Sequence, residues 1–378
     1  MQITALIITD AGCEQACALE MARWVKAVPH VGNQIIELEC SIEDACVLGY
    51  RLQTARRVLV KLLKIERIEM LMSLSFPESL VNQLIGPDHT FKAEVDVLRL
   101  GGPAGGPAAK LTAQEFVEEV GGWFHTASKR KVALNRPDHV VYGVATAQGI
   151  WVGIDVMGRS LSRREYRVML SRRSLKATIA ASAVMLSGAS EKGTLLDPFA
   201  DDGSIVVEAA LLRSGMSPWQ HSKGFSFQKF PVLAGWDAWA KPCKPIQQPI
   251  IAYTDSLQEL KAIRTNAKIA GVEKEIHATK VSLDWVDIKT DTRSVRAIVT
   301  SPLQSGKSID AKRVVKVLDR FFEQALFVLG KDGVIVCVTE KPEELLGPAQ
   351  RAGFSVFSQQ QVLMGLRRMT IVQFLKKK

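Results

Sequence analysis

The sequence predicts an α/β protein whose C-terminal half is a parallel sheet with helices on both faces. From about residue 177, apolar strand-like runs alternate with helical patterns, which is typical of a doubly wound parallel sheet. The last two runs, at 354–365 and 367–378, have no helix between them, so an antiparallel hairpin is expected to end the sheet. Two smaller α+β units are expected to precede it.

The first unit is expected to alternate strands and helices. The order strand, helix, strand, helix is predicted over residues 3–9, 14–28, 33–40 and 41–65. Ser41 opens the second helix as an N-cap, because Asp44 follows three residues later and can complete a capping box.

The second unit is expected to contain a strand, a helix and a hairpin, over residues 89–100, 111–127 and 139–158. Thr112 and Glu115 form a second capping pair at the start of the helix. The Gly- and Pro-rich segment 101–110 predicts a loop. The chain is therefore expected to divide into 1–65, 66–157, a basic connector at 158–176 and 177–378.

Composition predicts an ordinary globular protein of the cytoplasm. The 378 residues are 47% hydrophobic and 23% charged, and no apolar run approaches the length needed to cross a membrane. The first ten residues lack a basic leader, so no signal peptide is expected. Six cysteines in this length do not make a disulfide scaffold, and no metal site is expected from their spacing.

The charge balance predicts a polyanionic partner. The formal net charge is +10 and the isoelectric point is near 9.3, which suits binding to phosphates with release of counterions. The alternative is simple solvation of the surface. Clustering favours a phosphate-binding surface, made of Lys129, Arg130, Lys131, Arg163, Arg164, Arg167, Arg172 and Arg173.

Polar residues follow several strands of the predicted parallel sheet. The first strand ends in "DPFADDGS" (197–204), the second ends at Asp255, and the fourth ends in "SPLQ" (301–304). Ligands of doubly wound sheets bind at the carboxyl ends of the strands. We therefore expect a ligand cleft here, in which Asp255 could hold ribose hydroxyls.

The C-terminal unit resembles the class I AdoMet-dependent methyltransferases that modify guanine N2 in RNA. "LLDPFADDGSIVVEAA" (195–210) is similar to the family's first loop and following helix, and "RTNAKIAGV" (264–272) is similar to its Arg-x-Asn-Ala-x-x-Ala-Gly-Val segment. The resemblance implies a Rossmann-like methyltransferase fold for 177–378.

The two preceding units resemble domains that accompany these methyltransferases. The segment 117–145 and the exit "GRSLSRREYR" (158–167) are similar to a THUMP domain, which is an RNA-binding module, and residues 1–65 are similar to the ferredoxin-like domain before it. The resemblance thus covers nearly the whole chain. It implies a structured RNA partner, with tRNA as the first expectation and rRNA as the second.

The resemblance also implies which residues would hold the cofactor S-adenosyl-L-methionine (AdoMet). The matching positions are Asp197, Phe199, Asp201, Gly203, Asp255 and Ser282. The family's Gly-Ser-Gly is replaced here by Asp201-Asp202-Gly203. An aspartate at the first position adds bulk and sets a negative charge near the cofactor's carboxylate, a repulsion of roughly 1 kcal/mol or more.

The catalytic loop departs from the family pattern as well. Ser301, Pro302, Leu303 and Gln304 stand where the family has Asn/Asp-Pro-Pro-Tyr/Phe. The resemblance implies that Ser301 and the Pro302 carbonyl would accept hydrogen bonds from the guanine amino group. Gln304 lacks the ring that stacks on a flipped base, a contact worth roughly 1–3 kcal/mol.

These observations predict an RNA-binding protein in which methyl transfer is slow or absent. Guanine-N2 methylation with AdoMet stays open. A non-catalytic module that holds RNA or partners an active methyltransferase is the contrasting hypothesis. A third is a protein that binds another nucleotide in the same cleft.

Overall fold

The computed structural model describes residues 1–98, 112–189, 193–236, 248–307 and 309–377. The predicted loop at 101–110 lies outside these ranges. The chain forms two compact units, each described separately. Unit 1 comprises Met1–Thr9, Met21–Leu161 and His221–Lys241, and unit 2 comprises Asp10–Glu20, Ser162–Gln220 and Pro242–Lys378.

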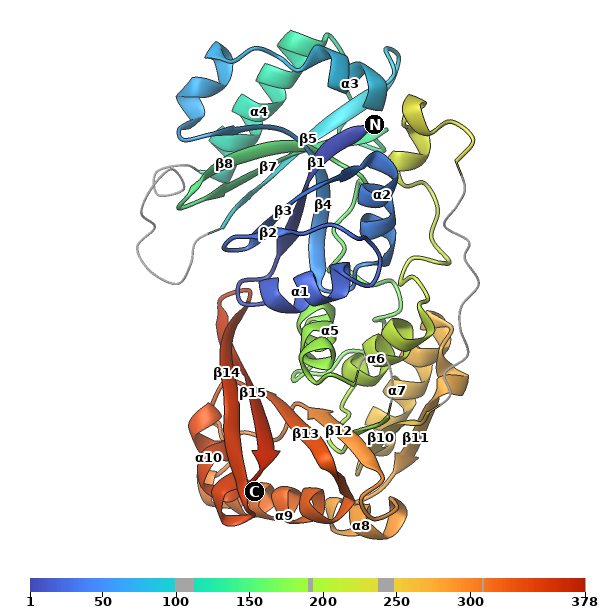
Figure 1. Ribbon diagram of the computed structural model, residues 1–378, viewed down its shortest axis with the longest axis vertical. Helices are drawn as coiled ribbons and strands as arrows, with labels where there is room; N and C mark the ends of the chain where they lie inside the picture. The colour runs from blue at the N-terminus through green and yellow to red at the C-terminus, as the bar shows by residue number, and fades with distance from the viewer. Residues whose placement is uncertain (99–111, 190–192, 237–247, 308, 378) are drawn as a thin grey trace. The chain divides into compact units, whose positions relative to one another are not determined.

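Unit 1 is built on an eight-stranded sheet with the order β2-β3-β1-β4-β8-β7-β5-β6 (Figure 1). Its strands are β1 (Gln2–Thr9), β2 (His30–Val31), β3 (Ile35–Ser41), β4 (Ala55–Ile65), β5 (Thr90–Val97), β6 (Lys131–Val132), β7 (His139–Thr146) and β8 (Gly149–Asp155). Neighbours are antiparallel except where β5 lies parallel to β6 and β7.

The predicted boundary after residue 65 falls at the end of β4, and β4 pairs with β8 within the same sheet. Arg57 of β4 reinforces this joint, because it pairs with Asp155 of β8 at 2.5 Å and with Glu94 of β5 at 2.6 Å. Segments 1–65 and 66–157 therefore share one sheet, and their separation into two domains stays a prediction.

The predicted helix over 41–65 is wrong in its second half. Helix α2 (Ile42–Arg51) ends before Leu52, and the rest of the segment is strand β4. Val58, Leu59 and Val60 are fully buried there between β1 and β8. A central strand covered on both faces has a continuous apolar run, and such a run fits a helix or a strand equally well by periodicity.

Both predicted capping boxes are present. The Ser41 side chain accepts from the amide of Asp44 at the start of α2, and the Thr112 side chain accepts from the amide of Glu115 at the start of α4 (Ala113–Ser128). Helix α4 packs on β5 and β7, and the short α3 (Glu78–Leu84) also belongs to unit 1.

Residues of the C-terminal half of the sequence also belong to unit 1. The short 3₁₀ helix η3 (Ser226–Lys229) lies beside β7, where Ser226 Oγ donates to the Asp138 carbonyl at 2.9 Å. The Phe230 ring stacks on the buried His139 with centroids 5.6 Å apart. These contacts explain why 221–236 groups with unit 1 and not with its sequence neighbours.

Unit 2 has the predicted doubly wound sheet, with the order β11-β10-β9-β12-β13-β15-β14 (Figure 1). Its strands are β9 (Thr194–Asp197), β10 (Ile250–Thr254), β11 (Ile276–Lys280), β12 (Val295–Thr300), β13 (Leu329–Thr339), β14 (Phe354–Met364) and β15 (Arg367–Lys376). The first five are mutually parallel, and β15 and β14 form the expected antiparallel hairpin.

Two hydrophobic cores lie on opposite faces of this sheet. Leu195 belongs to the core that contains α5 and α6, whereas its neighbour Leu196 belongs to the core that contains α9 and α10. This alternation follows from the twofold period of a strand. The helices of unit 2 are α5 (Ala177–Leu186), α6 (Ser204–Ser214), α7 (Leu257–Ala270), α8 (Val286–Lys289), α9 (Ala311–Val328) and α10 (Pro342–Arg351).

The helix predicted over 14–28 is shorter than expected and serves unit 2. Helix α1 spans Glu14–Met21, and Cys13 and Ala16 are fully buried in the core that contains α5 and α6. Asp10, just before it, accepts from Lys176 Nζ at 2.6 Å and from the Thr178 hydroxyl. Among the described residues, no helix is long and apolar enough to cross a membrane.

A buried ion pair fixes the connector (residues 158–176) to unit 2. Arg164 donates to both oxygens of the Glu208 carboxylate of α6, at 3.0 and 3.2 Å, and both side chains are fully buried. The Tyr166 hydroxyl donates to the same carboxylate at 2.7 Å. Farther along, Asn266 of α7 donates to the Met169 carbonyl at 2.9 Å.

Replacing Arg164 with alanine is expected to destabilise unit 2, because the Glu208 carboxylate would stay buried without its cation. Losing one partner of a buried pair typically costs about 3–5 kcal/mol of unfolding free energy. The exposed neighbour Arg163 is the matched control, and Arg163→Ala should change stability by less than about 0.5 kcal/mol. Urea denaturation followed by circular dichroism measures both, and equal stability of the two variants would contradict this role.

Candidate functional site

The loops that follow β9, β10, β11 and β12 meet at the carboxyl edge of the unit 2 sheet. From β9 the chain adds β10 and β11 on one side of the sheet and β12 on the other. This switch point between β9 and β12 is where doubly wound folds bind ligands. Two hollows lie here, and Arg173 and Phe199 line both of them. Nine predicted site residues can be compared with the linings: Phe199 lines both hollows, Asp255 and Ser282 line one, Asp197, Asp201 and Ser301 line the other, and Gly203, Pro302 and Gln304 line neither.

The large cavity has a volume of about 440 Å³. Asp255 at the end of β10 and Ser282 after β11 line it, as the sequence predicted, and both are exposed to solvent. Val281, Leu283 and Leu303 add apolar surface to its walls. A carboxylate beside apolar walls suits a ribose and a base.

Helix α9 forms another wall of the large cavity. Arg313, Lys316, Val317 and Arg320 face it, at positions that share one side of a helix. Arg320 is paired with Asp284 at 2.9 Å. These three cations were not among the residues expected from the sequence, although they are spaced three and four residues apart, as one side of a helix requires.

The small hollow lies under the loop after β9 and has a volume of about 10 Å³, which is room for about one water molecule. Its lining includes the three loop carboxylates, Asp197, Asp201 and Asp202, together with Ser301. One Asp201 oxygen, Oδ1, and one Asp202 oxygen, Oδ2, are buried without a hydrogen-bond partner.

Asp197 is held at the end of β9 by two donors. The Thr300 hydroxyl donates to its Oδ1 at 2.6 Å, and the Phe199 amide donates to the same oxygen at 3.1 Å. Burial outweighs these hydrogen bonds and raises the pKa of Asp197 from 3.8 to about 7. Asp197 is therefore a buried acid that loses its proton near neutral pH.

The connector supplies partners for the two additional acids. The Ser171 hydroxyl donates to Asp201 at 2.6 Å, and Arg173 lies 3.6 Å from the same carboxylate. Arg167 lies 3.7 Å from Asp202. The repulsion expected from the sequence is thus partly offset inside the unit, and burial still raises the pKa of Asp201.

Backbone geometry sets the loop's shape. Asp201 has a φ of 46°, a left-handed conformation that aspartate adopts at some cost. Gly203 has a φ of 82°, and a Cβ there would lie 3.2 Å from the Ile263 backbone of α7. Gly203 lines neither hollow, and its missing Cβ permits the close approach of α7.

The predicted catalytic loop is tied to the end of β13. Ser301 Oγ donates to the Val338 carbonyl at 3.0 Å. Gln304 Oε1 accepts from the Thr339 hydroxyl at 2.9 Å and from the Glu340 amide at 3.0 Å. Pro302 is buried. Gln304 thus anchors the loop.

The predicted RNA-binding residues fall into three groups. Lys129, Lys131, Arg163 and Arg172 are exposed, whereas Arg167 and Arg173 face the loop carboxylates. The prediction is wrong for Arg164, which is buried against Glu208, and for Arg130, which is also buried.

Arg130 is only 5% exposed. Its guanidinium donates to Asn82 Oδ1 at 2.8 Å and to the carbonyls of Ile85 and Gly86. A guanidinium with its donors engaged in this way is unavailable to a phosphate.

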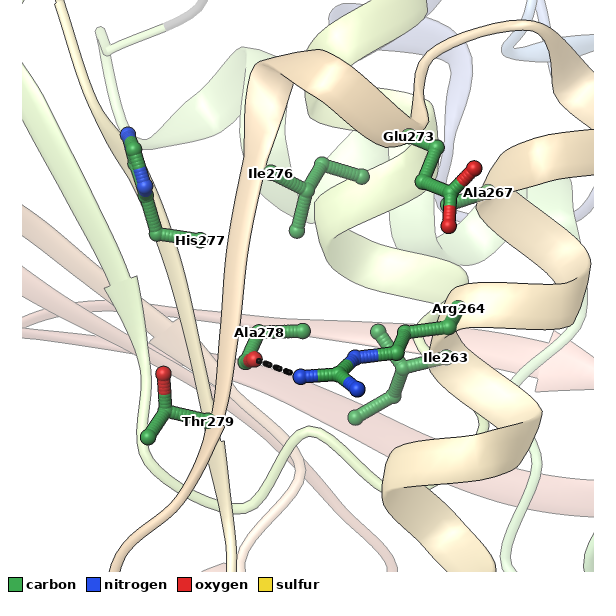
Figure 2. A pocket seen from close by; sticks show the side chains of 8 residues that line it. All are labelled: Ile263, Arg264, Ala267, Glu273, Ile276, His277, Ala278 and Thr279. Carbon is green, nitrogen blue, oxygen red and sulfur yellow. Dashed lines mark hydrogen bonds between the residues drawn. The ribbon is translucent and has the colours of Figure 1, made fainter.

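A further hollow of about 290 Å³ lies between α7 and β11, away from the carboxyl edge (Figure 2). Arg264 donates there to the Ala278 carbonyl at 3.2 Å. Ile276 and Ala278 point toward α7, whereas His277 lies on the other side of the strand (Figure 2). None of the sequence-predicted site residues lines this hollow. The described residues also contain no group of three His, Cys, Asp or Glu that could hold a metal.

The residues of the site fit one part of AdoMet and not the other. The large cavity offers Asp255 for ribose hydroxyls and apolar walls for the adenine. The methionine part needs room and partners for its carboxylate at the loop after β9. That place is a small hollow lined by three carboxylates, which do not suit a ligand carboxylate.

Replacing Asp197 with asparagine is expected to flatten the pH dependence of stability. The unfolded carboxyl ionises near pH 3.8 and the folded one near pH 7, so ionisation destabilises the folded protein progressively as pH rises through this window. Asparagine keeps an oxygen for Thr300 and Phe199 but cannot ionise.

Urea denaturation at pH 5 and pH 8 tests this. Relative to the parent protein, the variant should gain about 3 kcal/mol more at pH 8 than at pH 5. Parallel pH profiles of the two proteins would contradict the buried acid.

The comparisons with known proteins agree with this fold. Residues 164–370 match the family described as UPF0020, RMKL-like, methyltransferase domain. The tRNA (guanine(6)-N2)-methyltransferase of Methanocaldococcus jannaschii is 28% identical over 242 residues, which cover 62% of this chain and 63% of that protein. The ribosomal RNA large subunit methyltransferase K/L of Vibrio parahaemolyticus is 28% identical over 156 residues, 38% of this chain and 22% of that protein. The matches span less than two thirds of either relative.

Two solved structures share the fold over the whole chain. TrmN from Thermus thermophilus has a TM-score of 0.69 at 20% identity, with all of both chains covered. SMU.472, solved in complex with SAH, has a TM-score of 0.72 at 18% identity and covers 100% of this chain and 99% of that chain. Because the matched segment 164–370 is more than half of the sequence, the chain belongs to the UPF0020 family of RMKL-like methyltransferase domains.

Proposed function

We propose that this protein binds structured RNA and no longer transfers methyl groups. The absence of methyl transfer is inferred from one observation. The place for the methionine of AdoMet is a hollow of about 10 Å³ lined by Asp197, Asp201 and Asp202. Replacing a glycine loop with aspartates adds side-chain bulk and negative charge, and both disfavour a ligand whose own carboxylate must lie there.

RNA binding is supported by charge and by the relatives. The net charge of +10 suits a polyanion, and Lys129, Lys131, Arg163 and Arg172 are exposed. The relative from Methanocaldococcus jannaschii is a tRNA methyltransferase, and the one from Vibrio parahaemolyticus is a ribosomal RNA methyltransferase. We therefore propose a tRNA as first partner, a THUMP role for 66–157, a ferredoxin-like domain at 1–65, and a cytoplasmic setting.

The catalytic loop supports the loss of activity. The family's acceptor side chain is replaced by Ser301, whose proton is engaged with the Val338 carbonyl. No ring can stack on a base at Gln304, which instead holds Thr339 and Glu340. Positioning and stacking are the terms that align a flipped base with a methyl donor, and both are weakened together.

Guanine-N2 methylation is the second candidate. It is favoured by membership in a methyltransferase family and by Asp255 and Ser282, which line the large cavity at the positions expected for a nucleoside. An assay of tritiated-methyl transfer to bulk tRNA separates this candidate from RNA binding without methyl transfer.

Replacing Arg163 and Arg172 with alanine is expected to weaken binding to structured RNA about tenfold and to lower the salt slope by about 2, because each cation neutralises a phosphate. Lys268→Ala with Lys274→Ala is the matched control, since it removes two exposed charges from α7 and the turn after it. Filter binding of bulk tRNA at several salt concentrations measures both. Equal losses in the two variants would point to net charge and not to the connector.

The unaltered chain is expected to show no AdoMet binding by titration calorimetry and no tritiated-methyl transfer to bulk tRNA. Asp201→Gly with Asp202→Ser should create cofactor binding, because it removes two carboxylates and the strained left-handed aspartate. Adding Ser301→Asn, Leu303→Pro and Gln304→Tyr should then raise transfer, since alignment and stacking act together. Robust transfer by the unaltered chain would establish methylation and refute our proposal.

A further inference from the structure

Charged side chains of opposite sign lie on different walls of the large cavity and form no ion pair with the residues that the structure describes. Asp255 stands at the end of β10, and Arg313 and Lys316 stand on α9. The other charges of the lining are compensated in place, because Arg173 pairs with Glu259 at 3.1 Å and Arg320 pairs with Asp284. Within the described ion pairs of unit 2, neither Arg313 nor Lys316 takes part.

Arg313 and Lys316 lie near the N-terminus of α9, where positive charge destabilises a helix. The helix begins at Ala311 after the N-cap Asp310, and its first turn contains no acid. Cations near a helix N-terminus are disfavoured by the helix dipole, and like charges three residues apart repel each other. An anion between Arg313 and Lys316 would relieve both effects, which gives these side chains a purpose in binding.

The opposite wall suits the sugar and base of a nucleotide. Asp255 offers two acceptor oxygens, which match the paired hydroxyls of a ribose. Val281 and Leu283 line the cavity beside it, and Val317 lines it from α9. These apolar groups can cover the faces of a base.

We propose that the large cavity binds a ribonucleoside phosphate, with the phosphate on Arg313 and Lys316 and the ribose on Asp255. This goes beyond the proposed RNA surface, because none of these residues belongs to the exposed cations of the connector. The charge of the ligand also separates it from AdoMet. AdoMet carries a net positive charge, whereas a nucleoside phosphate carries a negative one that the unpaired cations favour.

The same chemistry could come from a free mononucleotide or from one nucleotide of an RNA chain. The binding groups are the same in both cases, so the cavity alone does not select between them. Competition distinguishes the sources. The competitor is whichever of AMP, GMP, CMP and UMP binds most tightly. If it displaces bulk tRNA, the nucleotide comes from RNA, and if tRNA binding is indifferent to it, a free mononucleotide is the ligand.

Titration calorimetry on the full chain tests the proposal with AMP, GMP, CMP and UMP, each beside its nucleoside. At least one nucleotide is expected to bind about tenfold more tightly than its nucleoside, as for a phosphate held by charged donors. Arg313→Ala with Lys316→Ala should remove this preference and leave nucleoside affinity unchanged. Asp255→Asn should remove the preference for that nucleotide over its 2′-deoxy form.

Lys268→Ala with Lys274→Ala is again the control for net charge and should bind the nucleotide as the parent does. All altered residues are exposed, and circular dichroism checks that the variants stay folded. The proposal is overturned if no nucleotide binds more tightly than its nucleoside, if the α9 variant keeps the preference, or if AdoMet binds more tightly than every nucleotide. Arg163→Ala with Arg172→Ala should leave nucleotide binding intact, which separates this result from the RNA surface.

Discussion

The buried pair of Arg164 and Glu208 determines the path of the connector, and the site depends on that path. Both side chains are fully buried, and the Tyr166 hydroxyl shares the carboxylate. A buried charge without its partner is costly, so the connector cannot leave α6 while unit 2 stays folded. This places Ser171 and Arg173 against the loop after β9, where they reach Asp201.

The loop after β9 shows how a fold can keep its backbone while its chemistry changes. The αL conformation at Asp201 and the glycine at position 203 preserve a tight turn into α6. The carboxylates introduced into that turn would repel one another, and connector arginines offset part of this repulsion. The loop carboxylates thus have cations of the same unit beside them, whereas Arg313 and Lys316 take part in none of the ion pairs described for unit 2.

The site therefore has two halves that differ in volume and in charge. Near Asp197 there is little volume and an excess of carboxylates, and near Asp255 there is a cavity of about 440 Å³ with cations on α9. Under the proposals above, the half near Asp255 binds a nucleoside fragment without help from the half near Asp197. Selectivity then follows the remaining charges, which here favour an anion.

The sequence by itself determined what depends on short-range pattern: the alternation of strands and helices in unit 2, both capping boxes, and the placing of Asp255 and Ser282 at strand ends. It did not determine that residues 55–65 form a central strand, because a continuous apolar run has no diagnostic period. Only the tertiary structure decided which arginines are buried. Arg164 meets a carboxylate 44 residues away, and the donors of Arg130 reach carbonyls 44 and 45 residues away. A cluster of cations has the same sequence pattern whether its partner is a distant residue or a phosphate. Only the packing of the folded chain distinguishes the two cases.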